Sequence, residues 1–189
     1  MSPKPMARPG GRSARVQQAV HAAVRELEAE RGRDALTVPL IAERAGVTPS
    51  TIYRRWGDLR ELLSDVAVER LRPESAPADH GSLPTDLTAW ADQFLEEMSA
   101  DPGRAYIRDA LLGAPDSGNA GACSEYAAGQ IEQILSRAIG RGERVPDVET
   151  VIDLVVAPMM YRIQFRPNPL PPDYARHLVE TTLNHLTSA

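Results

Sequence analysis

The feature that most constrains the fold is the stretch "AGVTPSTIYRRW", Ala45 to Trp56, in which a glycine turn precedes a threonine–proline pair. Threonine is favoured just before a helix, and proline is tolerated in its first turn, so this pair predicts a helix beginning at Pro49. A short helical pattern also precedes Gly46, and glycine commonly ends helices. The stretch therefore predicts two helices joined by a tight turn, as in a helix-turn-helix motif.

The second of these helices has two chemically different sides at about 100° per residue. Its apolar side can pack against the preceding helix, and its polar side carries hydroxyl and guanidinium groups. Such groups suit the phosphate oxygens and base edges of DNA. The alternative for this polar side is a solvated helix face. The apolar side holds Pro49, Ile52 and Trp56, the polar side holds Ser50, Thr51, Arg54 and Arg55, and Tyr53 lies on the border.

The remaining chain also shows helical spacing of apolar residues, and no alternating strand pattern of useful length appears. Ser13 is a candidate N-cap and Gly32 a candidate stop for a first helix, Thr37 can cap a second helix at 38–45, and Asp58 with Glu61 can cap a fourth. Further helices are predicted at about 84–99, 103–112, 120–140, 148–165 and 172–187. Pro158 lies inside one of them and predicts a kink.

Charge is divided unevenly along the chain. The whole chain has a net charge of −5, yet residues 1–72 hold 13 Lys and Arg against 9 Asp and Glu. A basic amino-terminal third followed by an acidic remainder predicts that the two parts of the chain have different functions. We expect a basic arm at 1–11, a DNA-binding domain at 12–72 and a larger domain at 73–189, with a linker rich in proline and small residues at 73–84. The arm can equally be a solvated, disordered leader.

The stretch Leu36 to Leu63, "LTVPLIAERAGVTPSTIYRRWGDLRELL", resembles the DNA-binding domain of TetR-type (TetR/AcrR) transcriptional regulators. The matching features include the Ala45-Gly46-Val47 turn, the aromatic Trp56 and the Leu62-Leu63 pair. The resemblance implies an all-α fold, in which a three-helix helix-turn-helix domain precedes a larger helical bundle for ligand binding and dimerisation. It also implies a homodimer that binds a palindromic operator in double-stranded DNA, most often as a repressor, and that a small molecule releases.

Carried onto this sequence, the resemblance implies a set of DNA-binding residues. One position departs from the family, because Leu59 stands where a phosphate-contacting lysine is usual and Arg60 follows it. Arg60 either replaces that contact or the contact is lost. The implied set is Thr37, Thr48, Ser50, Thr51, Tyr53, Arg54, Arg55 and Arg60.

Aromatic and methionine side chains of the larger domain are candidates for a ligand pocket, because apolar pockets are lined by such residues. Trp90, Phe94 and Met98 are spaced four apart and share one helix face. Packing in a bundle core is the alternative for each of them. The candidates are Trp90, Phe94, Met98, Tyr126, Met159 and Met160.

The last two helices carry apolar stripes, and the family forms its dimer seam there. Two such helices from each subunit can close a four-helix bundle, although some stripe residues must face their own core. The candidate seam residues are Ile152, Val155, Met159, Leu178, Thr182 and Leu186.

Several other classes of function lack support in the sequence. The chain has one cysteine, Cys123, and no cluster of metal-binding spacing, so we expect no metal and no cofactor. No apolar run is long enough for a membrane span and the first residues lack a signal-peptide pattern, so we expect a soluble, cytoplasmic protein. No catalytic motif appears, so a small helical enzyme is the least favoured alternative. The other alternative to a DNA-binding regulator is a helical interaction protein that does not bind DNA.

Overall fold

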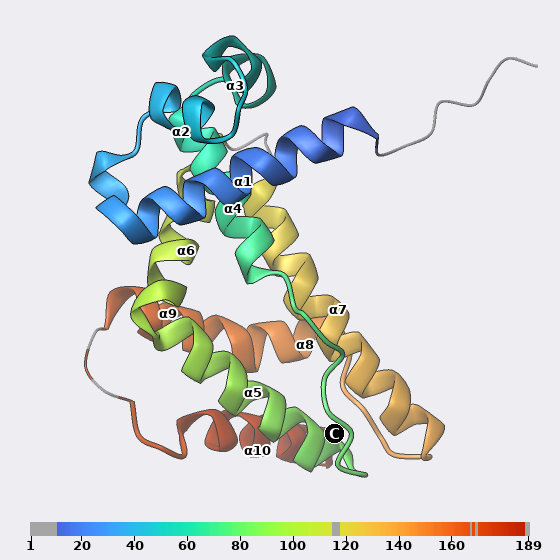
Figure 1. Cartoon of the computed structure of the whole chain (residues 1–189). Coiled ribbons are helices and arrows are strands. Elements are labelled where there is room, and N and C mark those ends of the chain that lie inside the picture. The colour runs from blue at the N-terminus through green and yellow to red at the C-terminus, as the bar shows by residue number, and fades with distance from the viewer. Residues whose placement is uncertain (1–10, 115–117, 167, 169, 188–189) are drawn as a thin grey trace, which may run out of the picture.

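The computed structural model describes residues 11–114, 118–166, 168 and 170–187, and every regular element in those residues is helical. The arm predicted at 1–11 lies outside the described residues apart from Gly11. Figure 1 shows a small lobe built from the amino-terminal helices above a larger bundle. The elements are α1 (Arg12–Arg31), η1 (Arg33–Ala35), α2 (Val38–Arg44), α3 (Pro49–Trp56), α4 (Leu59–Leu71), α5 (Leu83–Ser99), α6 (Asp101–Leu112), α7 (Asn119–Gly140), α8 (Val148–Val151), η2 (Ile152–Val156), α9 (Ala157–Phe165) and α10 (Tyr174–Thr187).

The small lobe is held by its own core, to which α1, α2, α3 and α4 each contribute. Val24, Leu27, Ile41, Ile52 and Leu62 are essentially inaccessible to water there. Burying each such side chain contributes about 1.5–3 kcal/mol, so a few of them fix how the short helices cross. The lobe thus positions α3 as a rigid projection at one end of the molecule (Figure 1).

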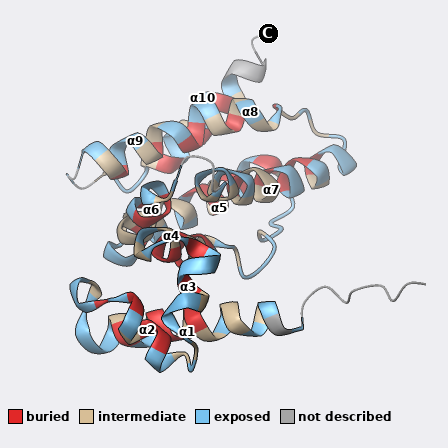
Figure 2. Cartoon of the chain, turned by 90° about the horizontal axis from the view of Figure 1, so that it is seen from above, coloured by how far each residue is buried: buried red, intermediate tan, exposed pale blue. Residues whose placement is uncertain are grey.

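The bundle has a second core between α5, α7, the α8–η2–α9 rod and α10. Leu87, Ile131, Ile134, Val155 and Met159 are fully buried in it. Figure 2 shows the buried faces of these helices turned toward one another and the exposed faces turned outward. The bundle and the lobe meet where α4, α6 and α7 pack together, and a small third cluster of Ala67, Val68 and Ala110 is buried there.

Two of the four predicted N-caps, Thr37 and Asp58, make the expected bond to the helix backbone. The Thr37 hydroxyl accepts the Leu40 N–H at 3.4 Å, and Asp58 accepts the Glu61 N–H at 2.9 Å. Thr48 precedes α3, with Pro49 at its first position. Gly46 has φ +66°, a conformation that L side chains rarely adopt, so the turn between α2 and α3 depends on glycine.

One predicted cap was wrong, and the helices predicted at about 103–112 and 148–165 are present with a slightly earlier start and an internal π segment, respectively. Ser13 is not the N-cap of α1, because that helix starts at Arg12 and Gly11 precedes it. The α6 helix starts at Asp101 rather than 103, since Pro102 is tolerated in a first turn. The predicted helix 148–165 is divided, because η2 is a π-helical segment in which the Ala157 N–H bonds to the Ile152 carbonyl. This segment ends at Val156, and Pro158 is the second residue of α9, so the proline lies in the first turn of that helix.

One glycine allows α5 and α6 to approach closely. A Cβ atom built on Gly103 would lie 2.1 Å from the Glu97 carbonyl oxygen. Real carbon atoms do not approach so closely, so any side chain at this position would push the two helices apart. The sharp corner between α5 and α6 therefore requires glycine.

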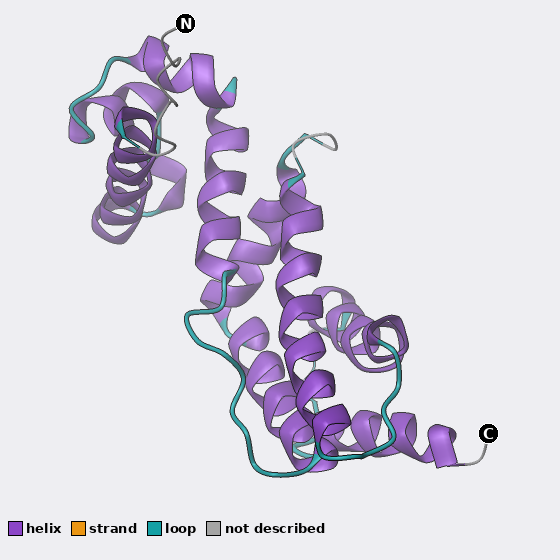
Figure 3. Cartoon of the chain, turned by 90° about the vertical axis from the view of Figure 1, so that its right-hand side faces the viewer, coloured by secondary structure: helices purple, strands orange, loops and turns teal. Residues whose placement is uncertain are grey.

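The segment 73–82 between α4 and α5 forms no helix and runs along the bundle as a strap (Figure 3). Side chains of α7 hold it by its carbonyl oxygens. Arg137 donates to the carbonyls of Pro77 and Ala78, both at 2.8 Å, and Gln130 donates to that of Ser75 at 3.2 Å. None of the described helices is long and apolar enough to cross a membrane.

Candidate nucleic-acid interface and cavity

The α3 helix divides into a buried side and an exposed side, as its sequence predicted. Ile52 is fully buried and Trp56 is 8% exposed, so both anchor the helix in the lobe core. Ser50 and Arg54 are exposed, and the Tyr53 ring is 50% exposed. Within the described residues, no hydrogen bond or ion pair engages the Arg54 guanidinium. The outer side of α3 therefore presents a hydroxyl, a phenol and an unpaired positive charge.

The start of α3 carries two hydroxyls that bond to each other. Thr48 Oγ1 and Thr51 Oγ1 lie 3.0 Å apart, and the Thr48 side chain makes no capping bond to the helix backbone. Thr48 is exposed and Thr51 is half-buried. Thr37, by contrast, is occupied at the start of α2 as its cap.

Two of the predicted DNA-binding arginines bond to other parts of the protein. The Arg55 guanidinium donates to the carbonyl and hydroxyl of Ser13, at 3.1 and 2.6 Å, and to the Gln17 amide oxygen at 2.5 Å. It also lies over the Trp56 ring, 5.1 Å from its centre. Arg60 donates to the Leu112 carbonyl at 3.2 Å. Arg55 thus ties α3 to α1, and Arg60 ties α4 to α6.

A buried histidine network that the sequence did not reveal lies directly behind α3. His21 of α1 is 1% exposed, and its two ring nitrogens face the carboxylates of Asp65, at 3.0 Å, and Glu69. Asp65 also accepts the Trp56 indole N–H at 2.7 Å. The network joins α1, α3 and α4 through one carboxylate. A single histidine on an apolar helix face gave no signal that two carboxylates from α4 would meet it.

The network favours a protonated imidazole. Burial alone lowers the pKa of His21, but its hydrogen bonds to Asp65 and Glu69 and their negative charges raise it above the ordinary value of 6.5. For Asp65, burial raises the pKa, and the bonds from His21 and Trp56 outweigh it and lower the pKa. Both nitrogens of an imidazolium are donors, which matches a ring held between two carboxylates.

A cavity of about 810 Å³ lies in the bundle between α5, α6, α7, the strap and the end of α4. Its walls include five of the six predicted pocket residues, namely Trp90, Phe94, Met98, Tyr126 and Met160. Met159 was predicted wrongly, because it is fully buried in the bundle core and lines no part of the cavity. Residues one position apart on a helix point in different directions, which explains why Met160 reaches the cavity and Met159 does not.

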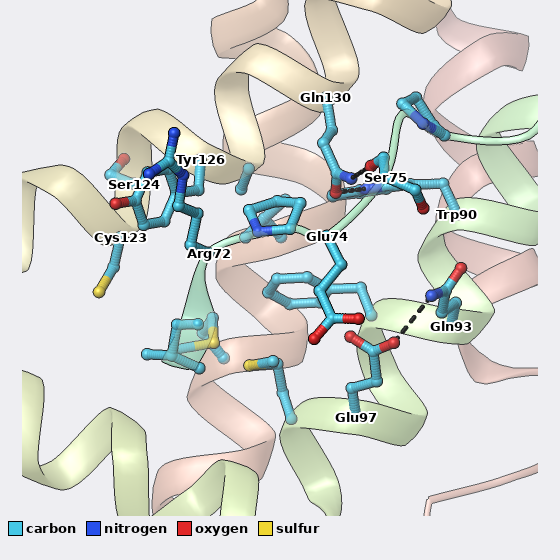
Figure 4. A pocket seen from close by; sticks show the side chains of 18 of the residues that line it. Arg72, Glu74, Ser75, Trp90, Gln93, Glu97, Cys123, Ser124, Tyr126 and Gln130 are labelled. Carbon is cyan, nitrogen blue, oxygen red and sulfur yellow. Dashed lines mark hydrogen bonds between the residues drawn. The ribbon is translucent and has the colours of Figure 1, made fainter. Parts of the chain in front are cut away.

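Aromatic and polar groups alternate along the cavity wall. The Trp90 and Phe94 rings stack with their centres 5.3 Å apart, and the Trp90 indole N–H donates to Gln130 at 2.8 Å. Figure 4 shows Gln130 bridging from Trp90 to Ser75 of the strap. Burial raises the pKa of the Cys123 thiol, which keeps it protonated and weakly reactive. No cluster of three or more possible metal ligands occurs in the described parts of the chain.

The cavity adjoins the residues that fasten the bundle to the lobe. Ile107, Ala110 and Leu111 of α6 line it, as do Arg70 and Leu71 at the end of α4. On the opposite side of α6, Asp109 forms a bidentate ion pair with Arg33, the first residue of η1. The Ser64 hydroxyl of α4 donates to the Ala110 carbonyl at 3.1 Å. The α6 helix therefore touches the cavity on one side and the lobe on the other.

The predicted dimer seam needs correction. Val155, Met159 and Thr182 are at most 1% exposed within one protomer, so they belong to the core of the bundle and cannot contact a second copy. Ile152 and Leu178 are half-buried against that core. The side chain of Leu186 lies outside the described residues. The seam prediction is therefore wrong for Val155, Met159 and Thr182, and it stays a prediction for Ile152 and Leu178.

The outward side of η2 and α9 carries its own apolar residues. Leu154 is 43% exposed, Tyr161 54% and Phe165 71%. The Tyr161 and Phe165 rings are in contact, with centres 5.3 Å apart. Tyr161 and Phe165 lie four residues apart and share one face of α9, and together with Leu154 of the preceding π-helical segment we call them the exposed stripe. This stripe is exposed in the single protomer.

Comparison with known proteins identifies both parts of the chain. Residues 20–66 match the family described as "Bacterial regulatory proteins, tetR family", and residues 77–182 match "Tetracyclin repressor-like, C-terminal domain". The chain belongs to the TetR family. Members of the TetR family are transcriptional regulators rather than enzymes, as the sequence predicted, and the all-helical fold with an amino-terminal helix-turn-helix is likewise confirmed.

Individual relatives agree with this assignment. An uncharacterized HTH-type regulator of Bacillus subtilis, YdeS, is 29% identical over 171 residues, which is 86% of this chain and 85% of that protein. Among solved structures, the TetR-family repressor FadR of Thermus thermophilus, crystallised with lauroyl-CoA, shares the fold with a TM-score of 0.60. It is 20% identical, over 90% of this chain and 93% of that one. NalD of Pseudomonas aeruginosa, a repressor of a multidrug efflux pump, has a TM-score of 0.53. It is 17% identical, over 92% of this chain and 96% of that one.

Proposed function

We propose that this TetR-family regulator is a homodimeric repressor that binds a palindromic operator through α3 and leaves it when a small molecule fills the cavity. The observation that carries the proposal is the position of α6, which lines the cavity on one side and bonds to the lobe on the other. The lauroyl-CoA bound to the FadR relative supports a ligand site within this fold.

Direct readout of bases is assigned to the outer side of α3. Arg54 is exposed and unpaired within the described residues, and Ser50 and Tyr53 flank it. An arginine in the major groove can bond to guanine in a bidentate manner. Thr48 and Thr51 lie at the start of α3, where the free N–H groups of a helix N-terminus favour negative charge. Their hydroxyls are therefore assigned to phosphate oxygens of the DNA. Thr37, at the start of α2, is likewise assigned to a phosphate of the DNA backbone.

Arg55 and Arg60 are assigned a secondary role. Their present bonds to Ser13, Gln17 and Leu112 must break, or share the guanidinium, before either can bind phosphate. Because an exposed hydrogen bond has a small net free energy, phosphate can compete for these donors. Arg55 and Arg60 then serve mainly to fix the angles of α3 and α4.

The proposed route of ligand release passes through α6. A molecule in the cavity contacts α6 and the end of α4, and α6 carries the Arg33–Asp109 ion pair. Ligand binding and DNA binding are linked whenever they favour different positions of α6. A shift of α6 would therefore turn the small lobe and change the spacing of the two α3 helices in the dimer.

We assign the dimer seam to the exposed stripe of Leu154, Tyr161 and Phe165. A palindromic site requires two α3 helices related by a two-fold axis, and apolar residues exposed on one face favour self-association. These residues lie on the helices from which the family resemblance implied the seam, but on the opposite side from the core.

The test is a gel shift with an operator selected from random DNA. We expect the wild-type protein to protect two half-sites about one helical turn apart, and the affinity to fall with rising salt. The variant Arg54→Ala should lose sequence preference at one position of each half-site. If no sequence is selected, or if Arg54→Ala selects the same sequence with the same affinity, the assignment of α3 is wrong.

Release is tested on the same complex. Asp109→Asn removes the charge that holds Arg33 and leaves α3 unchanged, so it should bind the operator but respond less to ligand. The matched control is Asp92→Asn, an exposed carboxylate on α5 that does not line the cavity. A response equal to that of the wild type in both variants would remove α6 from the proposed route.

A further inference from the structure

We infer that the ligand of the bundle cavity is an amphipathic organic cation, with its positive charge between Glu74 and Glu97 and its apolar part along Trp90 and Phe94. This inference rests on the proposed function only in treating the cavity as a ligand site. It goes further by naming the chemical class of the ligand.

The first observation is a pair of carboxylates without a cation. Figure 4 shows the carboxylates of Glu74, from the strap, and Glu97, from α5, pointing toward one another at the cavity. Glu97 accepts a hydrogen bond from the Gln93 amide at 2.7 Å. Within the described residues neither carboxylate has an ion-pair partner. Two facing negative charges repel each other, and a cation placed between them removes that repulsion.

The second observation is the aromatic wall beside this pair. Trp90, Gln93, Phe94 and Glu97 recur at a spacing of three or four residues, so they share one face of α5. The Trp90 and Phe94 rings are stacked and line the same cavity. An aromatic face attracts an organic ammonium group, and the same rings bury an apolar chain. The face of α5 therefore offers both parts that an amphipathic cation needs.

The other charged groups of the cavity do not cancel this preference. Asp86 is neutralised by Arg141, at 3.1 Å, and lies beside His80. The Arg70 guanidinium lies over the Tyr106 ring, 5.7 Å from its centre. Arg72 lies with Ser124 and Tyr126, on the other side of the cavity from Glu97 (Figure 4). A cation near Glu97 thus lies across the cavity from Arg72, and Arg70 is engaged by an aromatic ring.

The size of the cavity is consistent with a ligand of this class. A volume of about 810 Å³ falls within the range of small-molecule pockets. Besides the polar groups described above, Met98, Ile107, Ala127, Val156 and Met160 contribute apolar wall. A molecule with one charged end and an apolar body matches that distribution better than a molecule charged throughout.

The experiment compares two probes of equal chain length, decyltrimethylammonium and decanoate, with the full-length protein by titration calorimetry below their micelle concentrations. We expect the ammonium probe to bind about tenfold more tightly, because the carboxylates and rings favour it and repel decanoate. The double variant Glu74→Gln/Glu97→Gln should lose most of that difference. Glu96→Gln, which removes an exposed carboxylate of α5 outside this cavity, should keep it.

Equal or tighter binding of decanoate would overturn the inference, as would no binding of either probe. An unchanged preference for the ammonium probe in the double variant would also overturn it. The control for folding of the double variant is a thermal unfolding temperature equal to that of the wild type. A gel shift separates this result from the proposed function. If the ammonium probe binds through the two carboxylates but leaves the operator complex intact, the ligand class stands and the release mechanism fails.

Discussion

The histidine network behind α3 predicts a strong and pH-dependent effect of His21 on the small lobe. His21→Ala would remove a ring that is 1% exposed and leave Asp65 and Glu69 without their shared partner. Removing one member of a buried ion pair costs about 3–5 kcal/mol. The side chains of Asp65 and Glu69 are 29% and 45% exposed, so water can partly replace the lost partner. We therefore expect His21→Ala to lower the free energy of unfolding by about 3 kcal/mol, the lower end of that range.

The pH dependence has a defined sign. The pKa of His21 is raised in the folded state, so its stabilisation is complete below the unfolded value of 6.5 and is lost as pH rises through the folded pKa. The pKa of Asp65 is lowered, so its contribution is present above 3.8 and is lost as pH falls through the folded pKa. The network therefore stabilises most between these two values, and alkaline pH weakens it.

The assay is urea unfolding at pH 5.5 and pH 8.5 in a Trp90→Phe background, where Trp56 is the single tryptophan and reports on the small lobe. We expect the lobe to be less stable at the higher pH. His21→Gln, which can hydrogen-bond but cannot carry a charge, should remove the part of that change that His21 causes. If His21→Gln shows the same change as the parent, or if His21→Ala costs less than about 1 kcal/mol, the network does not hold the lobe as described.

Three further predictions concern the core, the interface and the helix corner. Val155→Asp buries an unpaired carboxylate in the bundle core and should prevent folding. Phe165→Glu changes an exposed residue and should leave a folded protein that sediments as a monomer. A folded Val155→Asp monomer, or a Phe165→Glu dimer of native affinity, would contradict this assignment of the two helix sides. Arg54→Ala should cost about 1–3 kcal/mol of operator binding in a gel shift while the melting temperature stays unchanged. Gly103→Ala should lower the stability of the bundle by about 1–3 kcal/mol in urea unfolding, despite alanine's better helix propensity, because α5 and α6 must separate; a more stable variant would show that the corner does not need glycine.

The sequence by itself determined the features that depend on local chemistry. The Gly46 turn, the caps at Thr37 and Asp58 and the two-sided α3 helix follow from residues within one or two turns of each other. The family resemblance over Leu36 to Leu63 indicated a DNA-binding transcriptional regulator, and the match over both parts of the chain confirmed that it belongs to the TetR family of such regulators. The face shared by Trp90, Phe94 and Met98 was also readable, because helical spacing alone places them together.

Only the tertiary structure decided which neighbour covers each face. Val155 and Leu154 are adjacent and both apolar, yet one is buried in the core and the other is exposed on the outer stripe. Arg55 fitted a phosphate contact by sequence, but the start of α1 lies close enough to bond to it. His21 meets its carboxylates only because α4 crosses α1 at that point. Helical periodicity fixes which residues share a side of one helix, whereas burial, ion pairing and pKa depend on a second helix that is distant in the chain.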